Sequence, residues 1–457
     1  MDIRIDRPPV GGRIKAIPSK SQAHRLLICA ALADGGAYIE CGGTSDDILA
    51  TAGCLESLGA RVYHDGDGFE VGPIPVQAIK GMVTQNCFES GSTLRFMLPV
   101  CCALGAGAEF ILNGRLGERP MDPLLKQLAS HGCEISGFTG NLICSGQLES
   151  GVFELPGDVS SQFISGLLMA LPLLDGDSVI NISGRIESGP YINMTLDALD
   201  IFGVRIKRES SRYSISGGQR FRSPGKISVE GDWSNAAFWL CAGAIGAGKA
   251  GVNAIGAGSV SAGAGKTDTD SAGVICTGLN PDSTQGDKAV TRLLEQFGAK
   301  VICGLDYAAV APSDLHGIRI DAGDIPDLVP ALSVVAAVAD GETEIYNAGR
   351  LRVKESDRLA AVSETLRALG ADIEETGDGL IIRGKSLRGG KSLRGGKSLR
   401  GGKVTSYGDH RIAMMAAIAS TVCEEPVLIT GAEAVNKSYP GFFDDFADLG
   451  GKVTRLR

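Results

Sequence analysis

A short pattern of apolar and polar residues recurs six times along the chain, each time as an amphipathic segment that ends at a glycine and passes into an apolar one. The six copies read LESLGARVY, LKQLASHGCEI, LDALDIFGVRI, LLEQFGAKVI, ETLRALGADI and FADLGGKVT. The amphipathic part predicts a helix and the apolar part predicts a strand. Glycine is typical just after the last helical turn, because it alone takes a positive φ without a Cβ clash. The glycines in these positions are Gly59, Gly132, Gly203, Gly298, Gly370 and Gly450.

The spacing of these glycines predicts a repeated unit and two insertions. Successive glycines lie 73, 71, 95, 72 and 80 residues apart, so two intervals are long. The 95-residue interval contains a stretch rich in Gly, Ala and Ser at about 248–273, and the 80-residue interval contains KSLRGG three times in succession at 385–402. Low-complexity sequence of this kind is typical of added loops. We therefore predict six similar units with two insertions.

The predicted elements indicate an α/β fold. Each unit mixes helices such as SQAHRLLICAALA with strands such as SVINISG and EFILNG. A chain of 457 residues is too long for a single compact core. The simplest arrangement is two domains of three units each, with a boundary near VEGDWSNAAF at 229–238.

Composition and charge narrow the class of protein. The net charge of −9 argues against a nucleic-acid-binding protein and against docking on anionic lipid, so an anionic ligand must be held by a local cluster of cations. No apolar run approaches the roughly 20 residues of a membrane helix. The N-terminus MDIRIDRPPVGG has neither a signal-peptide nor a transit-peptide pattern. We expect a cytoplasmic protein that acts as a monomer.

The twelve cysteines and five histidines have no metal-ligand spacing. There is no CxxC, and the one close pair, Cys101 and Cys102, lies in the apolar run FMLPVCCAL. Reduced core thiols are predicted, since the cytosol keeps thiols reduced and metal sites need clustered ligands. We expect no metal and no cofactor.

The glycine-rich stretch GAIGAGKAGVNAIGAGSVSAGAGKTDTD at 243–270 suggests a nucleotide-binding loop at first sight. A P-loop needs a first glycine, a Gly-Lys pair and a hydroxyl that reaches Mg²⁺. GAIGAGKA has Ala250 in place of the hydroxyl residue, and VSAGAGKT has Val260 in place of the first glycine. GAGKAG fits the dinucleotide pattern G-x-G-x-x-G, but SNAAFWLCAGAI before it predicts a helix where that pattern needs a strand. We interpret the stretch as an insertion and not as a nucleotide site.

The KSLRGG repeats raise the same question for nucleic acid. They place six basic residues in 18 but lack the interleaved aromatic residues that stack on bases. A flexible basic loop is the favoured interpretation.

Several polar clusters head predicted helices, where unpaired N–H groups and the helix dipole favour an anion. In PSKSQAHRLLICAAL, Ser19 or Ser21 can cap the helix, and Ser21 and Arg25 share one face. In SYGDHRIAMMAA, Asp409 is a good cap and Arg411 falls in the first turn. A cation at a helix start makes most sense when an anion shares the site.

Other clusters allow a plainer interpretation. RLRVKESDRLAA at 350–361 places Lys354 and Arg358 four residues apart and, taken alone, predicts a surface helix of salt bridges. GDVSSQF at 157–163, taken alone, is typical of simple helix capping. The remaining clusters are ESGSTLR, GERPMD, ESGPYI, DIPDLVPA and NKSYPGFF.

Taken together and in this order, the clusters resemble the 5-enolpyruvylshikimate-3-phosphate synthase family, the enolpyruvyl transferases of the shikimate pathway of aromatic amino acid biosynthesis. The motifs PSKSxxxR, GERPM, SSQF, VKESDR and GDHRxAM carry the resemblance, which runs from about residue 8 to residue 449. It implies two domains, each an inside-out α/β barrel of three βαβαββ units, with the active site in the cleft between them. It also implies that the first domain, residues 19–230, is inserted into the second, residues 1–18 plus 231–457.

The resemblance implies transfer of the enolpyruvyl group of phosphoenolpyruvate to the 5-hydroxyl of shikimate 3-phosphate, through a tetrahedral intermediate and with release of phosphate. These two small molecules are the implied partners. Each of their phosphates carries a charge of about −1.5 to −2, so many cations must converge on the site. Arginine suits this task because its planar group binds carboxylate and phosphate through paired hydrogen bonds.

Position by position, the resemblance implies a role for each cluster. Shikimate 3-phosphate would be bound by Lys20, Ser21, Arg25, Ser160, Ser161, Gln162, Ser188, Asp327, Arg350 and Lys354. Phosphoenolpyruvate would be bound by Lys20, Gly91, Arg119, Gln162, Arg358, Arg411 and Lys437. The catalytic residues would be Asp327 as general base for the attacking hydroxyl, Glu355 as proton donor to the methylene carbon, and Lys20, which both substrates share.

The chain departs from the commonest family pattern at two places. Glu89-Ser90-Gly91-Ser92 stands where N-A-G-T is frequent, and Arg350 stands where asparagine or histidine is frequent. The alternative activity is that of the sister family, which transfers enolpyruvyl to UDP-N-acetylglucosamine. That family typically has Lys-Asn where Lys20-Ser21 stand and a reactive cysteine where Gly114 stands. The resemblance therefore favours shikimate 3-phosphate as the acceptor.

Overall fold

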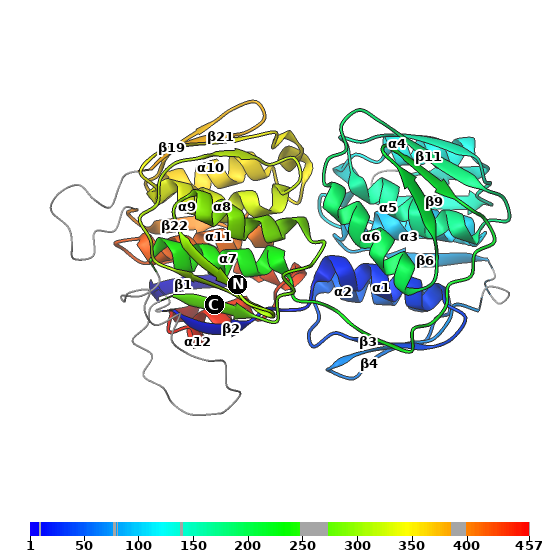
Figure 1. Cartoon of the computed structure of the whole chain (residues 1–457), viewed down its shortest axis with the longest axis horizontal. Coiled ribbons are helices and arrows are strands. Elements are labelled where there is room, and N and C mark those ends of the chain that lie inside the picture. The colour runs from blue at the N-terminus through cyan, green and yellow to red at the C-terminus, as the bar shows by residue number, and fades with distance from the viewer. Residues whose placement is uncertain are drawn as a thin grey trace. The chain divides into compact units, whose positions relative to one another are not determined.

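A computed structural model describes residues 1–8, 11–75, 79, 81–137, 140–246, 273–384 and 399–456. The chain divides into two compact units (Figure 1). Unit 1 comprises Met1–Ile17, Gly231–Ser283 and Asp287–Arg457, and unit 2 comprises Pro18–Glu230 and Thr284–Gly286. Both chain termini belong to unit 1, where the first and last strands pair.

Unit 2 is built from three βαβαββ repeats. The first contains β14 (Lys226–Ser228), α1 (Lys20–Leu32), β3 (Ala37–Glu40), α2 (Asp46–Ser57), β4 (Val62–His64) and β5 (Gly68–Val71). The second contains β6 (Met82–Asn86), α3 (Gly91–Ala103), β7 (Gly107–Ile111), α4 (Asp122–Ser130), β8 (Cys133–Ser136) and β9 (Asn141–Gly146). The third contains β10 (Val152–Pro156), α5 (Ser161–Ala170), β11 (Ser178–Ser183), α6 (Gly189–Ile201), β12 (Ile206–Glu209) and β13 (Arg212–Ile215).

Unit 1 repeats the same order three times, with strands from both ends of the chain. The first repeat contains β2 (Gly12–Lys15), α7 (Trp233–Ile245), β15 (Val274–Thr277), α8 (Val290–Gln296), β16 (Lys300–Cys303) and β17 (Tyr307–Ala311). The second contains β18 (Arg319–Asp321), α9 (Val329–Val338), β19 (Gly341–Tyr346), α10 (Arg358–Ala368), β20 (Asp372–Glu375) and β21 (Leu380–Gly384). The third contains β22 (Gly402–Thr405), α11 (His410–Ala419), β23 (Val427–Thr430), α12 (Phe442–Asp448), β24 (Lys452–Leu456) and β1 (Asp2–Arg7).

Each repeat forms one four-stranded sheet with the same topology. In the order β10-β11-β13-β12, the first two strands are parallel and the later pairs are antiparallel. A parallel pair needs a crossover connection, and between β10 and β11 that connection contains α5, the first helix of the repeat. The predicted α/β fold of two three-repeat bodies is confirmed.

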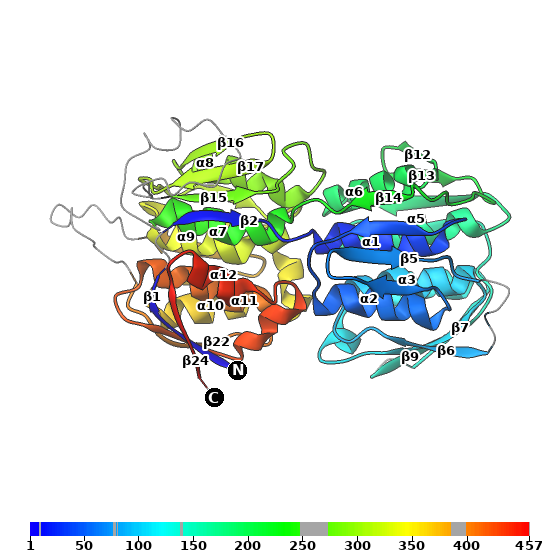
Figure 2. The ribbon, with the colours of Figure 1, turned by 90° about the horizontal axis from the view of Figure 1, so that it is seen from below.

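The first helix of each repeat is buried almost all round. Every residue of α7, α9 and α11 is buried, and these three helices pack against one another in the core of unit 1. Figure 2 shows α7 beside β15. The second helices are buried on one face; α4, for example, buries Leu124, Leu125 and Leu128. A helix that is apolar all round is a core helix, and an amphipathic one covers a surface.

All six predicted glycine stops adopt the left-handed backbone conformation. The φ values of Gly59, Gly132, Gly203, Gly298, Gly370 and Gly450 are 92°, 89°, 76°, 100°, 98° and 91°. Each follows the second helix of its repeat and precedes the third strand. This local prediction is confirmed in every repeat.

The two predicted insertions fall mostly outside the described residues. Residues 247–272 and 385–398 are not described, but the last four residues of the KSLRGG tract are. Leu399 is 2% exposed and pairs with Cys423, and Gly402 begins β22. The last four residues of the tract therefore belong to the described fold of unit 1, with Leu399 buried and Gly402 in a strand.

The predicted helix before the glycine-rich stretch is confirmed as α7, which ends at Gly246 with a φ of 119°. Gly243 lies inside this helix. A nucleotide-binding loop needs a strand at that point, so neither GAIGAGKA nor GAGKAG has the required context.

The cysteines are largely buried, as predicted. Eleven of the twelve are buried, Cys303 is exposed, and none forms a disulfide. No group of three or more His, Cys, Asp or Glu in the described ranges is arranged to hold a metal ion. No helix among the described residues is long and apolar enough to cross a membrane.

Gly203 allows a test of the glycine stops. Its φ is +76°, and an added Cβ would meet only the Arg222 side chain, at 3.6 Å, which is an ordinary contact. Gly203→Ala should therefore lower the free energy of unfolding by about 1 kcal/mol through backbone strain alone. The measurement is urea unfolding followed by circular dichroism.

The matched control is Gly53→Ala in α2. Gly53 is exposed, and an added Cβ meets nothing within 4 Å. This variant should be neutral or more stable by up to about 1 kcal/mol, because alanine favours a helix. An equal loss of stability in both variants would contradict the role of Gly203 as a glycine that is required by its positive φ.

Candidate active site

The site residues predicted in unit 2 lie where helices begin. Lys20 and Ser21 are the first residues of α1, Gly91 begins α3, and Ser161 begins α5. Ser188 precedes α6, and Arg119 follows the short turn Leu116–Glu118 before α4. Helix starts carry unpaired N–H groups and a partial positive charge, so these positions favour an anion.

Lys20 is held by a carboxylate of the neighbouring helix. Its Nζ donates to Asp47 Oδ2 at 2.7 Å, and the two side chains are 15% and 6% exposed. Ser19, rather than Ser21, caps α1 by accepting from the backbone N–H of Gln22 at 3.4 Å. The Lys20 ammonium is therefore fixed at the helix start.

Arg25 is a buried cation. It is 2% exposed, and it donates to Thr195 Oγ1 at 2.8 Å, to the Tyr191 carbonyl at 2.9 Å and to the Ser21 carbonyl at 2.5 Å. Its guanidinium lies over the Phe96 ring. Burial lowers the pKa of Arg25 to about 10. None of these partners is a carboxylate, so the positive charge of Arg25 is available to an anion at the start of α1.

Gly91 leaves room for a group of polar side chains. A Cβ there would lie 2.9 Å from Arg119 Nη1, 3.0 Å from Arg95 Nη1 and 3.8 Å from Gln162 Oε1. Arg95 Nη1 donates to Gln162 Oε1 at 2.7 Å, and Gln162 Nε2 donates to Ser92 Oγ at 2.9 Å. The structure thus brings together Gly91, Arg119 and Gln162, all three predicted for phosphoenolpyruvate.

Arg95 is a member of this group that sequence reasoning missed. It is 8% exposed and links Gln162 to the Pro120 carbonyl. The signal was its place in ESGSTLR, four residues after Gly91 and so on the same helix face.

The serines of unit 2 differ in their roles. Ser160 caps α5 by accepting from the backbone N–H of Gln162 at 3.3 Å, so the simple capping interpretation holds for its hydroxyl. Ser161 is 6% exposed in the first turn. Ser188 has a φ of 56°, a strained conformation for a residue other than glycine, which is common at functional sites.

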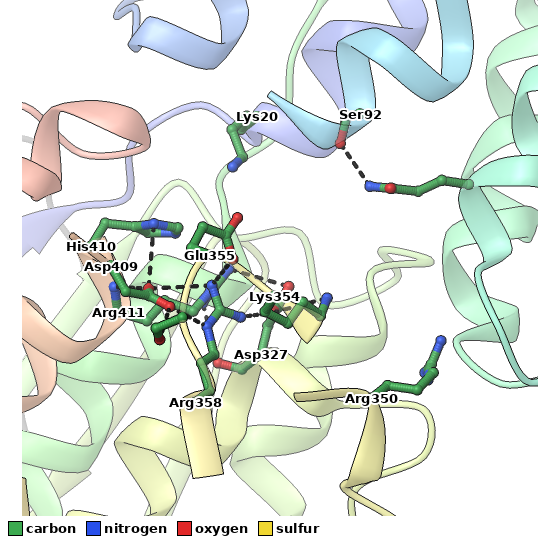
Figure 3. Close-up of polar contacts among 12 residues, drawn as sticks. Lys20, Ser92, Asp327, Arg350, Lys354, Glu355, Arg358, Asp409, His410 and Arg411 are labelled. Atoms are coloured by element: carbon green, nitrogen blue, oxygen red, sulfur yellow. Dashed lines mark hydrogen bonds and ion pairs between the residues drawn. The ribbon is translucent and has the colours of Figure 1, made fainter. Parts of the chain in front are cut away.

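In unit 1, Arg358 lies at the centre of three carboxylates (Figure 3). It is 1% exposed, and it donates to Asp327 Oδ1 at 2.6 Å, to Glu355 Oε2 at 2.5 Å and to Asp409 Oδ2 at 2.7 Å. Burial acts to lower the pKa of Arg358. The three carboxylates act the other way and raise that pKa above its ordinary value.

Asp327 is surrounded by cations. Besides Arg358, Lys354 Nζ lies 3.7 Å from its Oδ1 and Arg411 Nη2 lies 3.4 Å from its Oδ2. Burial acts to raise the pKa of Asp327. The charges of Arg411, Lys354 and Arg358 outweigh burial and hold the pKa of this carboxyl well below its ordinary value.

Lys354 is the residue of this cluster whose pKa lies nearest to neutral pH. Burial lowers the pKa of Lys354 to about 8, the charges of Asp327 and Glu355 oppose the shift, and those of Arg358 and Arg350 add to it. Arg350 donates to the Gly323 carbonyl at 2.8 Å.

Lys437 lies elsewhere along unit 1, at the end of the short helical turn Ala432–Lys437, and is 6% exposed.

The interpretation of residues 350–361 as one surface helix is wrong. A short 3₁₀ turn, Gly349–Val353, is followed by a break, and α10 begins only at Arg358. Asp357 caps α10 by accepting from the backbone N–H of Ala360 at 3.1 Å. Lys354 and Arg358 therefore do not share a helix face, and Arg358 is buried.

Asp409 was predicted as a helix cap, and it is one, since it accepts from the backbone N–H of Arg411 at 3.0 Å. Its second task, holding Arg358, was missed. Asp409 is 0% exposed and also accepts from Ser356 Oγ at 3.0 Å. Sequence shows a good cap here but cannot show a partner 51 residues away.

Comparison with known proteins gives consistent results. The family model "EPSP synthase (3-phosphoshikimate 1-carboxyvinyltransferase)" matches residues 6–267 and 267–446. A 3-phosphoshikimate 1-carboxyvinyltransferase of Clostridium kluyveri is 40% identical over 99% of this chain and 98% of its own length. One of Clostridium botulinum (strain Eklund 17B / Type B) is 42% identical over 96% of this chain and 95% of its own.

Solved structures show the same fold. The EPSP synthase of Acinetobacter baumannii is 25% identical, with a TM-score of 0.77 over 99% of this chain and 100% of that one. The enolpyruvyl transferase NikO of Streptomyces tendae is 16% identical, with a TM-score of 0.74 over 100% and 98%. At that identity the likeness to NikO concerns the fold alone.

The repeats and the charged helix starts are those of a transferase of the enolpyruvyl class. Among such enzymes, the full-length matches select one group: the chain belongs to the EPSP synthase (3-phosphoshikimate 1-carboxyvinyltransferase) family. The alternative, transfer to UDP-N-acetylglucosamine, is not favoured by these relatives.

Breaking the buried charge cluster around Arg358 should destabilise unit 1, because it leaves a buried charge without its partner. Asp409→Asn keeps the cap, since asparagine caps as well as aspartate, but removes a fully buried charge from Arg358. The expected loss in free energy of unfolding is about 3 kcal/mol, measured by urea unfolding.

Asp357→Asn is the matched control. Asp357 also caps a helix, but it is 38% exposed and pairs with Arg352. Asp357→Asn should lower the free energy of unfolding by less than about 1 kcal/mol. Because both variants keep a capping residue, similar losses in the two would contradict the assigned weight of the buried charge pair.

Proposed function

We propose that this chain transfers the enolpyruvyl group of phosphoenolpyruvate to the 5-hydroxyl of shikimate 3-phosphate and releases inorganic phosphate. The observation that carries the proposal is the group of cations and hydroxyls at buried helix starts, which suits ligands with several negative charges. The family supports the same reaction. The proposed residues belong to both units.

For shikimate 3-phosphate, we propose binding at the starts of α1, α5 and α6. Lys20 and Arg25 would supply the positive charge, and Ser21 would supply a hydroxyl. The partners of Arg25 among the described residues are hydroxyls and carbonyls, so its charge would serve the ligand. Hydroxyls and the Gln162 amide would bind the phosphate and ring oxygens; these side chains belong to Ser160, Ser161, Gln162 and Ser188. Asp327, Arg350 and Lys354 are the proposed contacts from unit 1.

For phosphoenolpyruvate, we propose binding where α3 begins. The backbone of Gly91 would approach the ligand closely because it has no Cβ, with Arg119 and Gln162 beside it. Lys20 would contact both substrates. The proposed contacts from unit 1 are Arg358, Arg411 and Lys437.

Arg358 must change partners to bind a substrate. All three of its guanidinium nitrogens donate to carboxylates. A bound phosphate or carboxylate would replace Asp327 or Glu355, while Asp409 would keep Arg358 in place. The carboxylate that is replaced, Asp327 or Glu355, would be released by the same exchange.

This exchange explains how Asp327 acts as a base. Its low pKa makes it a weak proton acceptor while the cations surround it. Substrate anions that neutralise Arg411 and Lys354 would raise the pKa of Asp327. Asp327 would then accept the proton of the 5-hydroxyl while the oxygen of that hydroxyl forms a bond to the central carbon of phosphoenolpyruvate.

The remaining proton transfers go through the methylene carbon. Glu355 would donate a proton to that carbon to form the tetrahedral intermediate. The methyl group would then return a proton to Glu355 as the carbon–oxygen bond to phosphate breaks, which gives the product. The proton held by Asp327 would leave with the inorganic phosphate, so both carboxylates end in their starting protonation states.

We propose that the chain acts as a monomer in the cytoplasm. The cysteines fit this location, since all twelve are free and eleven are buried, and a reducing compartment keeps thiols unpaired.

The function is tested by measuring phosphate release with phosphoenolpyruvate plus shikimate 3-phosphate. Parallel reactions replace shikimate 3-phosphate with UDP-N-acetylglucosamine, or both substrates with ATP. Release is expected with the shikimate pair only. Release with ATP but not with that pair would overturn the proposal.

Asp327→Asn tests the base. The variant keeps the size of the side chain but cannot accept the proton, so kcat should fall by about a hundredfold or more. Asp340→Asn, at an exposed aspartate of the same unit, is the control and should keep full activity. Full activity in Asp327→Asn would exclude the assigned role.

The pH dependence tests Lys354. Its positive charge is needed for anionic substrate and is present below its pKa of about 8. The value of kcat/KM, which reports the uncomplexed enzyme, should therefore fall above pH 8 by about tenfold per unit.

Lys354→Arg keeps its charge at high pH, so its profile should lack this decline. A decline that persists unchanged in Lys354→Arg would belong to another group.

A further inference from the structure

A buried hydrogen-bond chain in unit 2 takes no part in the substrate contacts proposed above. His24 Nδ1 lies 2.6 Å from Thr51 Oγ1, and Thr51 Oγ1 lies 2.8 Å from Thr93 Oγ1. Thr93 Oγ1 donates to Ser90 Oγ at 2.8 Å. All four side chains are 0% exposed. These hydrogen bonds thus link α1, α2 and the cap of α3 inside the core.

The donor and acceptor of each hydrogen bond can be assigned by starting from Ser90. The Thr93 hydroxyl has one proton and donates it to Ser90, so it must accept from Thr51. The Thr51 hydroxyl then has no proton left and must accept from His24. His24 therefore carries its proton on Nδ1.

The surroundings of His24 agree with this assignment. Its Nε2 is buried without a hydrogen-bond partner among the described residues, and the ring lies edge-on to Phe96 at 6.4 Å and 83°. A proton on Nε2 would be an unsatisfied buried donor there. Burial lowers the pKa of His24 to about 3; the charge of Asp47 opposes this shift, and those of Lys20 and Arg25 add to it.

The far end of the chain reaches the proposed phosphoenolpyruvate residues. Ser90 caps α3, and the next residue is Gly91, which faces Arg119 and Arg95. Ser92, one residue further, accepts from Gln162. A shift of the Ser90 cap would move the first turn of α3 and, with it, these groups.

We propose that His24 is a positioning residue for phosphoenolpyruvate that acts through Thr51 and Thr93 on the first turn of α3. The inference rests on the function proposed for Gly91, Arg119 and Gln162. A purely structural histidine would stabilise unit 2 but would not discriminate between the two substrates.

The first test needs no activity. ¹⁵N NMR of the whole chain labelled at histidine reports the tautomer, and His24→Asn identifies the signal by its loss. A neutral ring with its proton on Nδ1 is expected from pH 8 to pH 5. A ring protonated on Nε2, or a charged ring, would overturn this inference while leaving the proposed reaction untouched.

The second test separates the substrates. His24→Phe keeps a ring of similar size but removes the donor, so KM for phosphoenolpyruvate should rise by about tenfold. KM for shikimate 3-phosphate and kcat should change by less than about threefold. An equal rise in both KM values, or no rise, contradicts the inference.

Rescue and a control complete this comparison. His24→Asn places an amide N–H where Nδ1 stood, so it should restore most of the affinity. His131→Asn removes a histidine of the same unit that contacts the Gln127 carbonyl and stacks on Phe153; its KM for phosphoenolpyruvate should stay unchanged. A failure of His24→Asn to improve on His24→Phe would overturn the role of the Nδ1 donor.

The third test asks whether His24, Thr51, Thr93 and Ser90 act together as one hydrogen-bond network. Thr93→Val breaks it in the middle. The double variant with His24→Phe should then be little worse than either single variant, because both remove the same connection. Effects that multiply would show that the two residues act independently.

Discussion

The first helix of each repeat is buried all round, and the rest of the structure depends on this constraint. A buried helix start cannot leave its N–H groups unpaired, because each unpaired group costs free energy comparable to a lost hydrogen bond. The sequence meets this demand with Ser19, Ser90, Ser160, Asp232 and Asp409, each of which accepts from a backbone N–H of its own helix. Polar residues therefore gather at the same end of these five helices, whereas α9 has no side-chain cap among the described residues. Three of the proposed contacts, Lys20, Gly91 and Ser161, directly follow such a cap, and Arg411 lies two residues after Asp409.

The two units prepare for anions in different ways. In unit 2, Arg25 is buried among hydroxyls, carbonyls and an aromatic ring, and Lys20 is paired with Asp47. In unit 1, Arg358 is paired with three carboxylates. Such carboxylates keep a buried cation in place and satisfied, and under the proposed function substrate anions would take the place of one of them.

Local features of the fold could be predicted from the sequence, and long-range ones could not. The glycine stops depend on φ at one residue, so Gly59 and its five equivalents were predictable in every repeat. The buried position of Leu399 near the end of the KSLRGG tract could not be predicted, because the three copies of the repeat are identical in sequence. The spacing of Lys354 and Arg358 predicted a helix, but Asp357 starts a new one between them.

The site shows the same division. Sequence identified Asp409 as a cap, which is a local role, but not as a partner of Arg358. Arg95 was overlooked because its partner Gln162 lies 67 residues away. The resemblance supplied candidate residues but no contacts, and the contacts show which of them the fold brings together. Gly91, Arg119 and Gln162 form one such group, and Asp327, Lys354, Arg358 and Arg411 form another.

A crystal structure with shikimate 3-phosphate bound would test the central claim most directly, namely that the starts of buried helices bind the substrate. The account predicts the phosphate at the first turns of α5 and α6, within hydrogen-bond distance of the side chains of Ser160, Ser161 or Ser188, with Lys20 and Arg25 nearby. A phosphate bound instead by the glycine-rich residues 243–270, or away from every helix start, would contradict it.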